Sequence, residues 1–86
     1  MNSYRVALTA SATKELHRLP ADVIARIMPR LERLASSPRP PGCKKLKGGD
    51  KEWRIRVGDY RIVYEIHDAA KQIDVTRIAH LRDVYD

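Results

Sequence analysis

Alternating apolar and polar residues predict a β-hairpin in the middle of the chain. From Glu52 the pattern runs Trp-Arg-Ile-Arg-Val, and after Gly58-Asp59 it resumes as Tyr-Arg-Ile-Val-Tyr-Glu-Ile. A two-residue link that begins with glycine is typical of a tight hairpin turn. This turn places Arg56 opposite Arg61, on the face that also carries Arg54. The other face is expected to be apolar, with Trp53, Ile55, Val57, Tyr60, Ile62 and Tyr64.

The first half of the chain predicts one strand and two helices. Residues 3–9 favour a strand, and Thr9 is a suitable N-cap for a short helix. The pair Leu19-Pro20 ends that helix, and Pro20 can begin the next one. The apolar stripe expected on the second helix consists of Ile24, Ile27, Met28, Leu31, Leu34 and Ala35. A proline-rich connection, residues 36–42, follows.

Residues 72–80 alternate again and predict a last strand. If His67 pairs with Gln72, the face that carries Arg61 also carries Ile78 and His80. The element order βααβββ predicts a single α+β domain over residues 1–86. Its two N-terminal helices would pack on one face of a mainly antiparallel sheet, and the other face would be free, with the arginines on it.

Positive charge is concentrated on this hairpin and the loop before it. Residues 44–61 hold seven cationic and three acidic side chains, a net of +4 out of a formal +6 for the whole chain. Such a cluster favours a polyanionic partner. Arg56 and Arg61 would repel each other across the hairpin unless an anion lies over them. Four lysines are candidates for binding RNA backbone phosphates, although ordinary solvated lysines would fit as well: Lys44, Lys45, Lys47 and Lys51.

Metal, cofactor and membrane sites find no support in the sequence. Cys43 is the only cysteine, no Cys/His set has the spacing of metal ligands, and His17 and His67 look like surface residues without partners. Glu65 is expected to pair with Arg77 or a lysine. No apolar run approaches the ~20 residues of a membrane span, so we expect a cytoplasmic protein.

Taken together, these segments resemble the RelE/ParE superfamily of toxins from bacterial and archaeal toxin–antitoxin pairs, more closely its RelE branch. The similarity covers nearly the whole chain, and no single piece of it is diagnostic; the order and spacing are. The segments that carry the resemblance are residues 9–16, Leu19-Pro20, residues 37–42, 45–48, 53–64 and 79–85.

The resemblance implies a small RelE-like fold and a ribosome-dependent endoribonuclease that cuts messenger RNA by attack of the 2′-hydroxyl on the scissile phosphate. It further implies a cognate antitoxin, RelB-like, acidic and amphipathic, and contact with operator DNA only through the toxin–antitoxin complex. The candidate catalytic residues are Arg54, Arg56, Arg61, His80, Arg82 and Tyr85. The arginines suit phosphate binding, His80 suits proton transfer near neutral pH, and Tyr85 matches a position that contacts the RNA.

Two departures from the family pattern bear on catalysis. Lysines often stand where this chain has Arg54 and Arg56, and an arginine cannot easily act as a base. The family often has an arginine directly after the histidine, where this chain has Leu81 followed by Arg82. Arg82 replaces it only if the backbone is irregular there. A DNA gyrase inhibitor of the ParE type and a member that binds RNA or antitoxin without cleaving remain alternatives.

Overall fold

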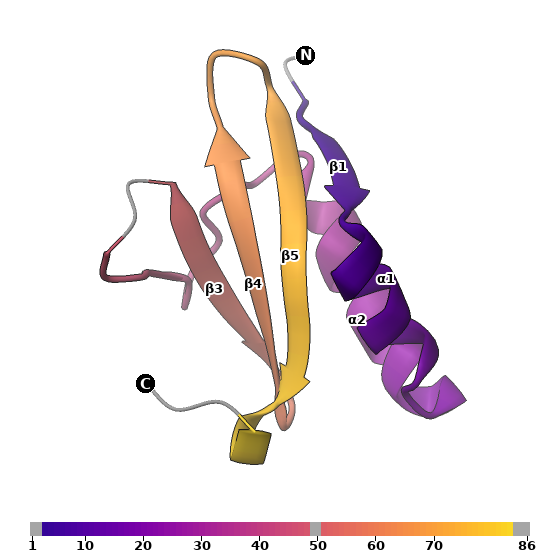
Figure 1. Cartoon of the computed structure of the whole chain (residues 1–86). Helices are drawn as coiled ribbons and strands as arrows, with labels where there is room; N and C mark the ends of the chain where they lie inside the picture. Colours follow the sequence, from indigo (N-terminus) through magenta and orange to yellow (C-terminus); the bar gives the residue numbers. More distant parts are fainter. Residues whose placement is uncertain (1–2, 49–50, 84–86) are drawn as a thin grey trace.

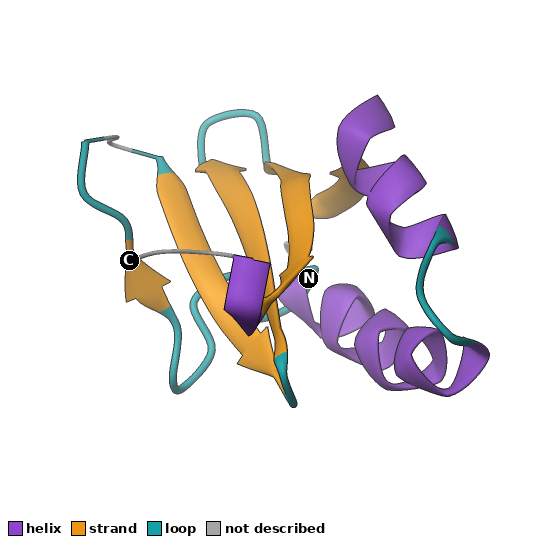
Figure 2. Ribbon diagram, turned by 60° about the horizontal axis from the view of Figure 1, so that its bottom comes forward, coloured by secondary structure: helices purple, strands orange, loops and turns teal. Residues whose placement is uncertain are grey.

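The computed structural model describes residues 3–48 and 51–83 and confirms the predicted α+β fold class (Figure 1). The elements are β1 (Arg5–Leu8), α1 (Ala10–His17), α2 (Ala21–Leu34), β2 (Lys44–Lys45), β3 (Glu52–Val57), β4 (Tyr60–His67), β5 (Gln72–His80) and a 3₁₀ turn η1 (Leu81–Asp83). The short strand β2 was not predicted. The strands form one sheet in the order β1-β5-β4-β3-β2. Only β1 and β5 run parallel, and both helices lie on one side of the sheet (Figure 2).

Thr9 caps the first helix as predicted, but Pro20 is the N-cap of α2 and not its first residue, and one part of the helix stripe was wrong. The Thr9 hydroxyl accepts a hydrogen bond from the Ala12 N–H at 3.2 Å and caps α1. On α2 the buried apolar residues are Val23, Ile27, Leu31 and Leu34, whereas Met28 is 38% exposed. Steps of four, four and three residues keep the buried set on one stripe, and Met28 lies about 100° around the helix from Ile27.

The β3–β4 hairpin has the predicted register. Arg56 pairs with Arg61 and Ile55 with Ile62. Gly58 has a φ of 58°, while Asp59 does not have positive φ, which is the combination of a type II′ turn. The face toward the helices supplies Ile55, Val57, Ile62, Tyr64 and Ile66 to the core, where they are buried in one cluster with residues of α1 and α2.

The pairing of β4 with β5 contains an irregularity that the sequence analysis did not foresee. His67 pairs with Gln72 as expected, but the register shifts by one residue between Val63 and Tyr64. Beyond the shift, Ile78 lies opposite Ile62 and Ala79 opposite Arg61. Because a bulge of one residue reverses which face the following side chains occupy, the expectation that Ile78 shares a face with Arg61 was wrong.

The proline-rich connection is tied to the sheet at three points. The buried Tyr64 hydroxyl donates a hydrogen bond to the Pro38 carbonyl at 2.8 Å, and burial raises the pKa of Tyr64. Arg39 pairs with Asp68 at 2.9 Å and lies over the Trp53 ring at 5.0 Å from its centroid. The pKa of Asp68 is lowered chiefly by its hydrogen bond from Arg39 and next by the hydrogen bond from Tyr4. These contacts bring the chain to the sheet edge where β2 forms.

No helix within residues 3–48 and 51–83 is long and apolar enough to cross a membrane.

Candidate functional site

A row of cationic residues crosses the sheet face that is turned away from the helices. Arg56 on β3 lies opposite Arg61 on β4, and Arg54, two residues before Arg56, lies opposite Lys44 on β2. Because side chains alternate along a strand, these four residues share one face. The tertiary structure thus assembles the predicted cationic surface and adds Lys44 to it.

The burial of two of these arginines contradicts the expected free face. Arg54 and Arg61 are each 6% exposed, whereas Arg56 is exposed. All three take part in interactions within the chain. Charges are costly to bury unless they are compensated, so the two buried guanidinium groups act as fixed charges inside the sheet surface. Arg56 is the one of the three that can directly contact a large ligand in this structure.

His80 lies at the end of β5, one residue past the partner of Arg61. It pairs with Tyr60, so its side chain starts from the face opposite the arginines, and the expectation that it shares their face was wrong because of the bulge. Its ring meets the Tyr60 ring edge-on, with centroids 5.1 Å apart. Its Nδ1 accepts a hydrogen bond from the Arg82 backbone N–H at 3.1 Å. This bond assigns the proton of the neutral ring to Nε2.

The backbone after His80 has the irregularity that a role for Arg82 requires. The chain leaves β5 directly into η1, and Arg82 is exposed within that turn. The Leu81 N–H donates to the Asp59 carbonyl at 2.8 Å, which joins η1 to the β3–β4 turn (Figure 1). Arg82 therefore starts next to the end of the hairpin that carries Arg56 and Arg61. Tyr85, the last predicted site residue, lies outside the described residues.

The four predicted RNA-binding lysines are all exposed. Lys44 and Lys45 form the edge strand β2, Lys47 follows in a turn, and Lys51 precedes β3. Alternation places Lys44 on the arginine face and Lys45 on the other. Charged side chains on an edge strand also hinder pairing with a second sheet, so exposure by itself does not distinguish RNA binding from protection of the edge.

A second polar cluster on the same sheet face was missed by the sequence analysis. His67 is not without partners: its Nε2 lies 3.3 Å from Glu65 and 3.3 Å from Asp74. Glu65 does not pair with Arg77, which instead lies 3.7 Å from Glu15 on α1. The expected pairing of His67 with Gln72 was the available signal, since the same register aligns Glu65 with Asp74.

Comparison with known proteins identifies the relatives of this chain. Residues 6–85 match the family model described as the ParE toxin of type II toxin–antitoxin systems. The chain is 32% identical over 77 residues to the toxin RelE of Mycobacterium tuberculosis, covering 88% of this chain and 79% of that one. It is 29% identical over 86 residues to the toxin RelG of the same organism, with 95% of each chain covered. The structure of the archaeal RelE–RelB complex from Pyrococcus horikoshii matches with a TM-score of 0.81 at 28% identity, over 91% of this chain and 94% of that one.

Proposed function

The chain belongs to the ParE toxin family of type II toxin–antitoxin systems, and we propose that it is a ribosome-dependent endoribonuclease that cleaves messenger RNA in the cytoplasm. A RelB-like antitoxin would neutralise it, and it would reach operator DNA only within that complex. The curated relatives named RelE and RelG and the matched RelE–RelB structure support this choice. The observation that carries it is the opposed pair Arg56–Arg61 near the end of the hairpin, where the exposed Arg82 also lies and where His80 starts from the other face.

The chemistry proposed for the arginines is binding of the scissile phosphate. Attack by the 2′-hydroxyl builds negative charge on the phosphorane, and guanidinium groups bind phosphate oxygens in bidentate fashion. Arg56 is exposed and would contact the phosphate directly. Arg54 and Arg61 are buried and would add fixed positive charge beneath it. None of the three would act as base, because arginine stays protonated.

His80 and Arg82 would act on the protons and on the leaving group. In the observed geometry Nδ1 of His80 is occupied by the Arg82 N–H, so the ring presents Nε2–H and can donate a hydrogen bond to a phosphate oxygen. His80 would become a base only after that bond is released. Arg82 is exposed and would stabilise charge on the 5′-oxygen, and Tyr85 would contact the RNA.

The exposed lysines would hold the rest of the RNA. Lys44, Lys45, Lys47 and Lys51 would contact backbone phosphates of the messenger or of ribosomal RNA. Contacts of this kind release counterions, so binding should weaken steeply as salt rises, and it should not depend on base sequence.

The test is to induce the chain without antitoxin and to map the 5′ ends of translated and untranslated transcripts. We expect growth arrest and new ends confined to translated regions, in phase with codons. Arg56→Ala should reduce cleavage about 100-fold, the usual scale for losing one charge-stabilising donor. Arg18→Ala is the matched control, because Arg18 is exposed at the end of α1 and far along the chain from the hairpin. Equal cleavage by both variants would refute the proposed role of the arginine row in binding the scissile phosphate.

Inhibition of DNA gyrase is a second candidate, favoured by the burial of Arg54 and Arg61 and by the position of His80 off their face. It requires a protein-binding surface and no phosphate site. Growth arrest with altered supercoiling and intact messenger RNA would support it. Absence of arrest, with the protein still folded and bound to antitoxin, would indicate a member that binds without cleaving.

A further inference from the structure

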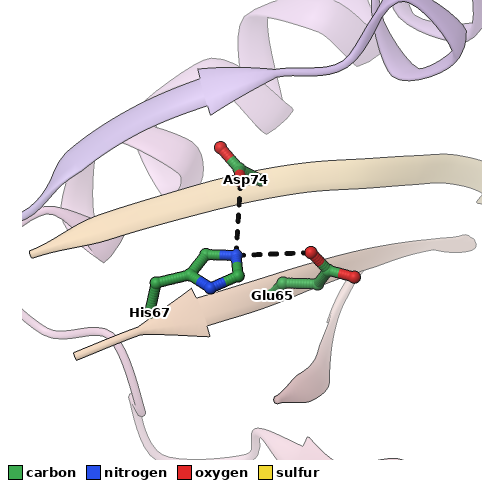
Figure 3. Close-up of side chains that lie close together, drawn as sticks. All are labelled: Glu65, His67 and Asp74. Atoms are coloured by element: carbon green, nitrogen blue, oxygen red, sulfur yellow. Dashed lines mark ion pairs between the residues drawn. The ribbon is translucent and has the colours of Figure 1, made fainter. Parts of the chain in front are cut away.

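Glu65, His67 and Asp74 gather on the sheet face turned away from the helices (Figure 3). Glu65 and His67 lie two residues apart on β4, and Asp74 lies directly opposite Glu65 on β5. The Nε2 atom of His67 lies 3.3 Å from a Glu65 oxygen and 3.3 Å from an Asp74 oxygen. One ligand atom from each residue lies within 4.8 Å of the other two.

Three carboxylates lie in line around the single imidazole of this cluster. Glu52, Glu65 and Asp74 are direct partners across β3, β4 and β5, so three carboxylates form one row across the sheet. Like charges directly opposite each other destabilise a sheet. The His67 ring can carry at most one positive charge, which cannot balance three carboxylates. A divalent cation at the centre of the cluster would offset more of this repulsion than the imidazole does.

Two of the distances between the ligand atoms suit a small divalent metal. Tetrahedral Zn²⁺ binds nitrogen and oxygen ligands at about 2.0–2.2 Å, which places neighbouring ligand atoms about 3.3–3.6 Å apart. Both distances from His67 Nε2 fall at the short end of this range. The second oxygen of Asp74 accepts a hydrogen bond from the Gln72 amide at 2.9 Å, which orients the carboxylate. Such outer contacts are usual around metal ligands.

We propose that Glu65, His67 and Asp74 form a binding site for a first-row divalent cation, Zn²⁺ in the first instance, with one coordination position open to water. One imidazole and two carboxylates are a ligand set that zinc accepts. The three side chains are partly exposed, so an ion can reach them from solvent.

A bound ion would link β4 to β5 and stabilise the centre of the sheet. Glu65 is four residues along β4 from Arg61, or about 13 Å at the usual rise of a strand, whereas Arg54 pairs with Val63, two residues from Glu65. The three proposed ligands are nevertheless different residues from those of the arginine row. The proposal therefore does not depend on the proposed ribonuclease activity and is tested on binding and stability alone.

The test is calorimetric titration of chelator-treated protein with Zn²⁺, together with thermal unfolding in Zn²⁺ and in chelator. We expect one equivalent to bind and the melting temperature to rise with the metal. His67→Ala and Asp74→Asn should each weaken binding about 10-fold or more, by analogy with the losses seen when metal sites are disturbed. His17→Ala is the matched control, because His17 is exposed on α1, and it should bind like the parent.

Glu65→Gln separates loss of a ligand from loss of the fold. It removes a charge between Glu52 and Asp74, so its melting temperature in chelator should be no lower than that of the parent, while the gain with Zn²⁺ should disappear. Absence of saturable binding by the parent would overturn the proposal. So would equal affinity of the parent and His67→Ala, which would mark the metal as bound adventitiously elsewhere.

Discussion

Tyr64→Phe isolates the hydrogen bond that fastens the proline-rich connection to the sheet. The Tyr64 side chain is fully buried, and its hydroxyl donates to the Pro38 carbonyl at 2.8 Å. Phenylalanine keeps the ring and its packing, so the substitution removes the hydroxyl and leaves the carbonyl without this donor. The connection then loses one of the contacts that bring it to the edge of the sheet.

The size of the effect follows from the net value of a hydrogen bond, about 0.5–1.5 kcal/mol. Full burial of the ring favours the upper half of that range. For a domain of this length, each kcal/mol lowers the melting temperature by roughly 4–8 °C, so we expect a decrease of about 4–12 °C. Thermal unfolding followed by circular dichroism at neutral pH measures it.

Alkaline pH gives an independent check on the same residue. Burial raises the pKa of Tyr64 above its ordinary value of 10.0. Above pH 10.0 the unfolded chain therefore releases this proton while the folded protein keeps it, and the stability that Tyr64 contributes falls as pH rises, by up to ~1.4 kcal/mol per pH unit. Tyr64→Phe should lose less stability than the parent over this interval.

The matched control for Tyr64→Phe is Tyr4→Phe, which removes an exposed hydroxyl that donates to Asp68. Water can replace that bond at the surface, so the loss of melting temperature should be clearly smaller. An unchanged melting temperature in Tyr64→Phe, or an equal loss in both variants, would refute the assigned role of the buried hydroxyl.

Two further substitutions test contacts at the bulge and at the connection. Glu15→Ala removes the carboxylate that accepts the Ile78 N–H at 2.7 Å, so unfolding in urea should show a loss of about 1–2 kcal/mol, and Glu15→Gln, which keeps an acceptor, should lose less. The pKa of Asp68 is lowered chiefly by its bond with Arg39, so its contribution is present above the unfolded value of 3.8 and is lost as pH falls through the folded value. Asp68→Asn should therefore lower the melting temperature at neutral pH, and the difference should shrink as pH falls through the folded pKa of Asp68; a constant difference across pH would contradict this origin.

The hairpin shows how far a local pattern can predict structure. Gly58-Asp59 fixes the turn type, the turn fixes the register, and strict alternation then predicts which residues face the helices. The same rule failed on β5. One extra residue on that strand, opposite Val63 and Tyr64, reverses the alternation and moves His80 away from the face of Arg61. The charge-assisted hydrogen bond from the Ile78 N–H to Glu15 lies just beyond the shift. Because the two residues are 63 positions apart, the sequence around either one does not predict this contact.

The candidate site, like the fold, was predicted from the sequence only in part. The sequence predicted the opposed arginines and the exposed lysines, because pairing and charge depend on neighbours along two adjacent strands. It could not predict that Arg54 and Arg61 are buried while Arg56 is exposed, since burial depends on everything packed above a strand. Nor did it predict the Glu65–His67–Asp74 cluster, which joins side chains from two strands.

By itself, the sequence determined the fold class, the order of the two helices and the four longer strands, and the concentration of positive charge on one hairpin, because propensity, alternation and turn chemistry act over a few residues. Only the tertiary structure decided the register beyond the bulge, the hydrogen bond that occupies His80 Nδ1 and the meeting of His67 with two carboxylates. These features depend on how separate strands and turns pack together. A contact between segments that are far apart in the sequence leaves no periodic pattern of residues in either segment.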